Sequence, residues 1–153
     1  MTKSNPRRLA RELVMQGLYQ RLLSGNTAEA IAQQLAETDR FATADRAFFQ
    51  ELWRGVIADE GAMIDAIAPH VSRKVEALSP VERAILTVGA WELVHRLDIP
   101  YRVVINEAVE LAKSFGGVDG HRFVNGVLDK LAADVRADEI RASAAERAAG
   151  SAP

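Results

Sequence analysis

The sequence contains no cysteine, which excludes disulfides and thiolate chemistry. It has no apolar run approaching the roughly 18 residues needed to span a bilayer. Its N-terminus, MTKSNPRRLAREL, lacks the apolar core of a signal peptide. These absences favour a cytoplasmic protein that does not enter a membrane. With 153 residues, 48% of them hydrophobic, the chain is long enough for one compact globular domain.

The patterns of common metal and enzyme sites are also missing. The three histidines, His70, His95 and His121, are far apart and show no i, i+4 pairing, so we expect no metal site. There is no G-x-S-x-G nucleophile motif. The glycine cluster at 116–120 lacks the lysine of a phosphate-binding loop and indicates a helix end followed by a new helix.

One glutamate could still serve as an acid or base. Glu92 shares a helix side with Ile85 and Val88, which suggests partial burial. No second poised group accompanies it, so we expect Glu92 to pair with Arg96 four residues later. The sequence therefore predicts no catalytic residue and no cofactor.

Helical periodicity is present along most of the chain, and no alternating strand pattern of useful length appears. A capping residue followed by proline starts helices at Asn5-Pro6 and at Ser79-Pro80, the second with a capping box to Glu82. Gly61 indicates a bend within the long third helix. The expected helices run from residue 6 to the break at 24–26, briefly after Thr27, and over about 43–68, 80–97, 102–115 and 119–136.

Two segments differ from this pattern. The helix after Ser79 is apolar on two sides, which predicts a central position. Residues 137–153 are rich in alanine, arginine and glutamate but have no consistent apolar stripe. We expect this tail to be frayed or disordered.

The net charge of −2 does not suggest a nucleic-acid binder, but the charge distribution is uneven. Basic residues outnumber acidic ones within residues 1–24. Arg7, Arg8 and Arg11 lie in the first turns of a helix, where each cation opposes the helix dipole at a cost of about 0.3–1 kcal/mol. The same arrangement would favour a phosphate.

An aromatic side chain follows these arginines on the same helix. At roughly 100° per residue, Arg8, Arg11, Met15 and Tyr19 share one arc, and a tyrosine beside arginines can stack on a base. A solvated charge run with a half-buried tyrosine explains these residues equally well.

Several segments of the sequence are distinctive in combination. They are PYRVVINEAVELAKSFGG and GHRFVNGVLDKL, residues 100–117 and 120–131, VERAILTVGAWEL at 81–93, RRLAREL at 7–13 and LY at 18–19. In order and spacing they resemble the NusB family of bacterial transcription antitermination factors, and the first two are similar to the C-terminal hallmark of that family. The resemblance covers about residues 6–136.

The resemblance implies an all-α fold of two packed three-helix bundles with about six to seven helices. One helical domain would cover residues 1–136, with an N-terminal bundle over about 6–70 and a C-terminal bundle over about 71–136. It also implies binding to the boxA element of nascent rRNA transcripts together with NusE, a small-subunit ribosomal protein. These contacts would belong to an antitermination complex with RNA polymerase, without catalysis or a cofactor.

The resemblance also implies roles for particular residues. The expected RNA-binding residues are Arg7, Arg8, Arg11, Tyr19, Lys113, Asp119, Phe123 and Asn125, and Glu82 is the expected partner-binding residue. Phe123 lies at the edge of a buried helical stripe, so satellite core packing is the alternative to base stacking.

Three positions depart from the family pattern or match nothing in it. Leu9 replaces a position that is often basic, which implies a weaker basic patch. Gly17 stands where relatives often carry alanine, and Gly120 matches no pattern.

Two other readings compete with this one. One is the NusB-like RNA-binding domain that is attached to rRNA cytosine methyltransferases; we expect no catalytic domain, because none follows residue 136. The other is a helical scaffold that binds proteins only. A gel shift with boxA-like RNA separates the scaffold from the two RNA-binding readings.

Overall fold

The computed structural model describes residues 5–150, and within that range the chain is helical with no strand. These described residues form eight α-helices, slightly more than the six to seven expected, and two short 3-10 helices. The elements are α1 (Pro6–Ser24), α2 (Ala28–Ala36), α3 (Asp39–Thr43), α4 (Arg46–Ile67), η1 (Ala68–His70), η2 (Val75–Ala77), α5 (Pro80–His95), α6 (Tyr101–Phe115), α7 (Gly120–Val135) and α8 (Ala137–Gly150).

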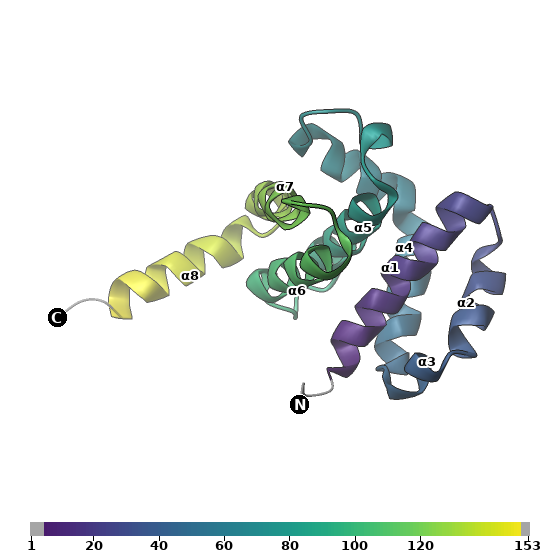
Figure 1. Cartoon of the computed structure of the whole chain (residues 1–153). Helices are drawn as coiled ribbons and strands as arrows, with labels where there is room; N and C mark the ends of the chain where they lie inside the picture. The colour runs from purple at the N-terminus through teal and green to yellow at the C-terminus, as the bar shows by residue number, and fades with distance from the viewer. Residues whose placement is uncertain (1–4, 151–153) are drawn as a thin grey trace.

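Helices α1 to α4 pack together on one side of the molecule and α5 to α7 on the other (Figure 1). Helix α5 contacts α1, α4, α6 and α7, so it joins the two groups. All its residues from Ala84 to Leu93 are buried. The predicted central position of this helix is therefore confirmed.

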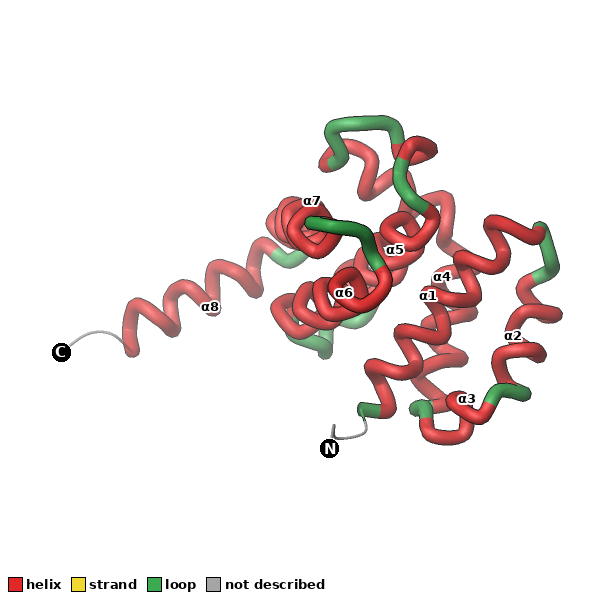
Figure 2. The backbone as a smooth tube through the Cα atoms, in the orientation of Figure 1, coloured by secondary structure: helices red, strands yellow, loops and turns green. Residues whose placement is uncertain are grey.

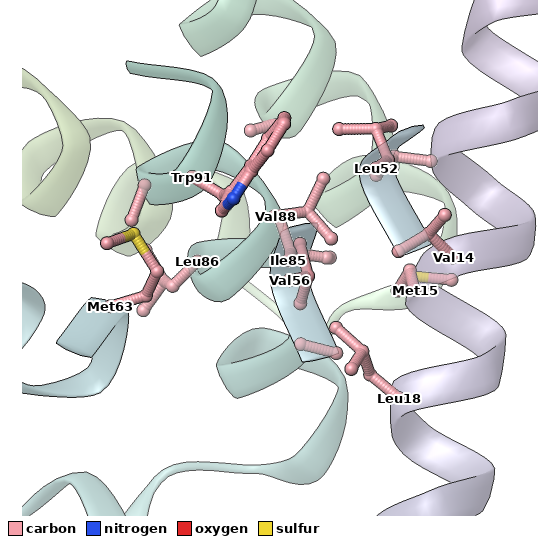
Figure 3. Packing of buried hydrophobic residues seen from close by; sticks show 14 of the residues in the cluster. Val14, Met15, Leu18, Leu52, Val56, Met63, Ile85, Leu86, Val88 and Trp91 are labelled. Atoms are coloured by element: carbon pink, nitrogen blue, oxygen red, sulfur yellow. The ribbon is translucent and has the colours of Figure 1, made fainter. Parts of the chain in front are cut away.

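The side chains between α1, α4 and α5 form the middle of the core. Figure 3 shows Val14 and Leu18 of α1 directed toward Leu52 and Val56 of α4 and toward Ile85 of α5. All five are buried. This continuous apolar packing fixes α1, the helix that carries the expected basic surface, against α5.

The predicted helix starts have the expected caps. Asn5 Oδ1 accepts a hydrogen bond from the Arg8 amide at 3.0 Å, and Ser79 Oγ accepts one from the Glu82 amide at 3.1 Å. Each bond satisfies an amide that has no partner within its helix. The reciprocal bond, in which the Ser79 amide would donate to the Glu82 carboxylate, is absent among the described residues, so only half of the predicted capping box forms.

Gly17 has a packing role that the sequence did not reveal. A Cβ at this position would lie 2.6 Å from the Trp53 ring and 3.1 Å from Leu35. The missing side chain lets α1 approach α2 and α4 closely. The bend of α4 lies at Asp59, where φ is −114° and ψ is 16°, and not at the expected Gly61.

The expectation that the tail is disordered is wrong for residues 137–150, which form α8. Alanine has the highest helix propensity, which explains a helix without an apolar stripe. The helix buries no residue and extends away from the rest of the molecule (Figure 1). Arg136 directly precedes α8, and its buried guanidinium donates to Glu139 in the first turn of that helix.

Candidate nucleic-acid interface

The start of α1 exposes two of its three arginines. Arg8 Nε donates to Glu107 Oε2 of α6 at 2.7 Å, and Arg7 Nε lies 3.7 Å from Asp45 Oδ2. The Arg7 guanidinium also sits 4.7 Å from the centre of the Phe48 ring. The Arg7–Asp45 pair is exposed and contributes only about 0–1 kcal/mol, so a phosphate can replace its carboxylate. Glu107 is only 13% exposed and accepts from two nitrogens of Arg8, so that pair is held more firmly.

The third arginine lies inside the molecule. Arg11 is 3% exposed and donates to both carboxylate oxygens of Glu92 at 2.8–3.1 Å. Burial raises the pKa of Glu92, and the Arg11 guanidinium opposes that shift. The structure therefore places Arg11 out of reach of a ligand at the surface, unlike Arg7 and Arg8.

The expected pair between Glu92 and Arg96 is wrong. Glu92 points into the interface with α1, whereas Arg96 pairs with Asp98 at 2.9 Å and with Glu51 at 3.0 Å. The Arg96 guanidinium lowers the pKa of Asp98 to about 2. The i, i+4 rule compares residues within one helix and does not include a partner on another helix.

Tyr19 is separated from the arginines by buried residues. Its side chain is 39% exposed, but Met15, the next member of the predicted arc, is buried like Arg11. Tyr19 is followed instead by the exposed side chains of Leu22 and Leu23. The end of α1 therefore presents an apolar surface and not a continuation of the basic one.

Lys113 and Asp119 lie on either side of the turn from α6 to α7, and both are exposed. Lys113 Nζ is 3.6 Å from Glu110, and Asp119 is 3.8 Å from Arg122. Asp119 adopts a left-handed backbone conformation with φ of 64°, which aspartate tolerates better than most residues. Its side chain does not cap α7 and faces solvent.

Phe123 and Asn125 lie on opposite sides of α7. Phe123 is half-buried and lines a cleft of about 290 Å³ between α7 and the segment after α4. Asn125 is exposed and lines another cleft, of about 380 Å³, with Tyr101 and Asn106 of α6. The two predicted RNA-binding residues therefore do not share one site.

Glu82 lies at the start of α5, close to the start of α7. A Cβ on Gly120 would approach Glu82 Oε1 to 2.8 Å. Gly120 therefore leaves room for the Glu82 carboxylate at the start of α7, although the end of this flexible side chain could shift to accommodate a Cβ. Glu82 is half-buried, so part of its surface remains available to a partner.

Basic residues that the sequence pattern did not reveal lie around Phe123. The Arg73 guanidinium lies 5.3 Å from the centre of the Phe123 ring, and Lys130 lines the same cleft. Lys130 follows Phe123 by seven residues and therefore shares its helix face, a signal that periodicity could have supplied. Arg73 lies outside any helix, where periodicity does not apply.

No helix of the described residues is long and apolar enough to cross a membrane. Within the same residues, no group of three or more histidine, aspartate or glutamate side chains is arranged to hold a metal ion.

Comparison with known proteins identifies the family. The model of the NusB family matches residues 8–133. Transcription antitermination protein NusB of Azoarcus sp. is 52% identical over 98% of this chain and 97% of its own length. The protein of the same name from Ralstonia nicotianae is 57% identical over 89% of this chain and 88% of its own.

Solved structures agree with the sequence comparison. NusB of T. maritima superposes with a TM-score of 0.74 at 30% identity, covering 85% of this chain and 92% of that one. A chain from a complex of the antitermination factors NusB and NusE with double-stranded RNA has a TM-score of 0.70 at 23% identity, covering 81% of this chain and 93% of that one, and it supports the fold alone. The relatives are named for a regulatory and not an enzymatic role, and this chain belongs to the NusB family.

Proposed function

We propose that this chain is an RNA-binding transcription antitermination factor. It binds the boxA element of nascent rRNA transcripts together with NusE, in the cytoplasm, as part of an antitermination complex with RNA polymerase. The observation that carries the proposal is the similarity, over nearly the whole chain, to proteins named transcription antitermination protein NusB. That a related fold forms a complex with NusE and RNA adds support.

The geometry supports RNA as a ligand at the start of α1. Arg7 and Arg8 are exposed, and the exposed pair of Arg7 with Asp45 is weak enough for a phosphate to displace the carboxylate. Arg11 acts differently in this proposal. By binding Glu92 of α5 it fixes α1, and with it the two exposed arginines, so it is a positioning residue.

The remaining proposed contacts come from α6 and α7. Lys113 attracts a phosphate, Asp119 accepts hydrogen bonds from base amino groups, and Asn125 offers both donors and acceptors to a base edge. Phe123 offers a ring on which a base can stack. Because Phe123 and Asn125 face opposite sides of α7, the RNA must pass around the start of that helix to reach both.

The exposed apolar surface at the end of α1 favours a protein partner as well. Tyr19 and Leu22 remain exposed there, and Glu82 lies at the start of α5. We propose Glu82 as a contact of NusE. Tyr19 remains a proposed RNA contact, and its exposed apolar neighbours would suit contact with a protein equally well.

A gel shift tests this function directly. The full chain is titrated into a labelled single-stranded boxA-like RNA, with and without NusE, and a scrambled RNA serves as the control. We expect a shift with the boxA-like RNA that NusE strengthens. No shift under either condition would support a scaffold that binds only proteins.

The partner contact has its own test. Glu82→Lys should weaken NusE binding more than Glu82→Gln, because the lysine reverses the charge and the glutamine keeps the shape. Thermal unfolding of both variants controls for the contact between Glu82 and Gly120. If both folded variants bind NusE like the unaltered chain, Glu82 is not part of the partner surface.

A further inference from the structure

The basic side chains of the molecule differ in whether a carboxylate already neutralises them. Arg7, Arg8 and Lys113 each lie within 4 Å of an aspartate or glutamate. Arg73 and Lys130 form no ion pair with any described residue, and both lie beside Phe123. Two positive charges without a carboxylate partner among the described residues therefore lie together beside an aromatic ring at this cleft.

The cleft has two well-defined walls. One is the connector, residues 68–78, which contains η1 and η2 and links α4 to α5; Figure 2 shows it as short helical turns joined by loop. The other wall is α7. His70 Nε2 lies 3.0 Å from Asp134 Oδ2 of α7 and ties the walls together. Val71 of the connector packs against the core, so the connector wall is anchored independently of any ligand.

The Phe123 ring is already used for a cation–π contact. The Arg73 guanidinium lies 5.3 Å from the ring centre, within the range of that interaction. At an exposed site such a contact contributes about 0.5–1 kcal/mol, and Arg73 is exposed. A ligand that offers both a planar group for the ring and an anion for the guanidinium can therefore displace Arg73 from Phe123.

A nucleotide supplies both of these groups. Its base offers a flat π-face to Phe123, and its phosphates offer negative charge to Arg73 and Lys130. Inorganic phosphate would use the cations but leave the ring exposed. An apolar peptide would use the ring but leave two cations without counter-charges.

We propose that the cleft between the connector and α7 binds one nucleotide of single-stranded RNA. The base stacks on Phe123 while Arg73 and Lys130 contact the flanking phosphates. The site rests on the proposed RNA-binding function and adds to it the connector, which no sequence motif implicates. It is separate from the arginines at the start of α1.

The test uses the full chain and a fluorescein-labelled single-stranded boxA-like RNA, with affinity measured over a range of salt concentrations. The variants are Phe123→Leu, Arg73→Gln and Lys130→Gln. The matched control is Arg54→Gln, an exposed arginine of α4 that also forms no ion pair among the described residues but lies beside α2. Thermal unfolding confirms that each variant is folded.

We expect Phe123→Leu to lose RNA affinity by roughly five- to a hundredfold, the value of one stacked base. Arg73→Gln and Lys130→Gln should each make the log–log salt slope shallower by about 0.7, the contribution of one phosphate contact on a single strand. Arg54→Gln should change neither quantity. An RNA carrying 5-iodouridine should crosslink on irradiation to the peptide that contains Phe123.

Failure of the site and failure of the function give different results. If the unaltered chain binds no RNA with or without NusE, the function and the site are both wrong. If it binds RNA but Arg73→Gln and Lys130→Gln keep its affinity and slope, the site alone is overturned. Those two exposed positions decide the outcome even if Phe123→Leu fails to fold.

Discussion

At the scale of single residues, the three arginines at the start of α1 have different environments although they lie within five positions. Arg7 and Arg8 remain at the surface, whereas Arg11 lies one helical turn further on, where α1 packs on α5. The sequence placed all three on a basic helix start. It could not show which part of that helix another element covers, because Glu92 is 81 residues away.

Removing one side of the buried pair should strongly destabilise the fold. Arg11→Met leaves the Glu92 carboxylate buried without its partner, and the expected loss is about 3–5 kcal/mol of unfolding free energy. The double variant Arg11→Met/Glu92→Met removes both charges and should recover most of that loss. Urea unfolding measures each change, with Arg54→Met as the exposed control.

RNA binding by the same variants tests the positioning role of Arg11. The double variant should keep the salt slope of the unaltered chain, because Arg11 contacts no phosphate in the proposed complex. A stable Arg11→Met variant whose slope is shallower by about 0.7 would instead make Arg11 a phosphate contact.

At the scale of elements, most helices could be predicted because their start signals are local. Asn5, Thr27 and Ser79 each accept a hydrogen bond from an amide three residues later. The short helix α3 and the kink at Asp59 were missed. Five residues are too few to show a repeated apolar spacing. The kink lies at an aspartate and not at a glycine or proline, so the sequence does not mark its position.

Two glycines of α4 should respond in opposite ways to alanine. A Cβ at Gly55 would overlap the Trp91 ring of α5, whereas a Cβ at Gly61 would meet nothing within 4 Å. Gly55→Ala should therefore destabilise the protein by about 1–3 kcal/mol through overpacking. Gly61→Ala should stabilise it by up to about 1 kcal/mol through helix propensity. Urea unfolding of both variants gives the comparison, and a stabilising Gly55→Ala would contradict the close approach of α4 and α5.

The end of α7 contains the buried guanidinium that caps α5. Arg136 donates to the backbone carbonyls of Leu93, Ile99 and Arg96 at 2.7–3.0 Å and to that of Glu92 at 3.2 Å. The Glu92 and Arg96 carbonyls also accept from the backbone amides of Arg96 and Ile99, so the Leu93 and Ile99 carbonyls depend most on Arg136. Each buried carbonyl left without a partner costs about 1–3 kcal/mol. Sequence periodicity predicted that a helix ends near Arg136. It could not predict the role of this side chain, because the acceptors lie in α5 and in the turn after it.

Truncation and substitution should therefore have unequal effects at this end of the chain. Arg136→Met should lower the unfolding free energy by about 2–6 kcal/mol, because the Leu93 and Ile99 carbonyls lose their donor. Removing residues 144–153 deletes only part of a helix that buries no residue, and the expected change is within about 0.5 kcal/mol. The truncation retains Glu139, which bonds both Arg136 and the Tyr101 amide. A large loss on truncation would show that α8 packs on the molecule more than its exposure indicates.

At the scale of the whole molecule, a net charge of −2 must be reconciled with the proposed polyanionic ligand. Carboxylates pair with the arginines at the start of α1, whereas Arg73 and Lys130 beside Phe123 form no ion pair among the described residues. Overall composition therefore does not reveal this local positive charge. The resemblance to the family suggested RNA as the ligand, and only the fold brought Arg73 next to Phe123 across 50 residues of sequence.

The salt dependence of RNA binding measures how many phosphates these basic side chains neutralise. If Arg7, Arg8, Lys113, Arg73 and Lys130 each neutralise one phosphate, the log–log slope should be about −3.5. Arg73→Gln/Lys130→Gln and Arg7→Gln/Arg8→Gln should each reduce it to about −2, because each removes two contacts. Fluorescence anisotropy across a salt series gives the slopes, with Arg54→Gln as the control. A slope that falls only for the Arg7 and Arg8 variant would confine the phosphate contacts to the start of α1. A slope that both double variants leave unchanged would place the RNA on another surface, despite the free charge beside Phe123.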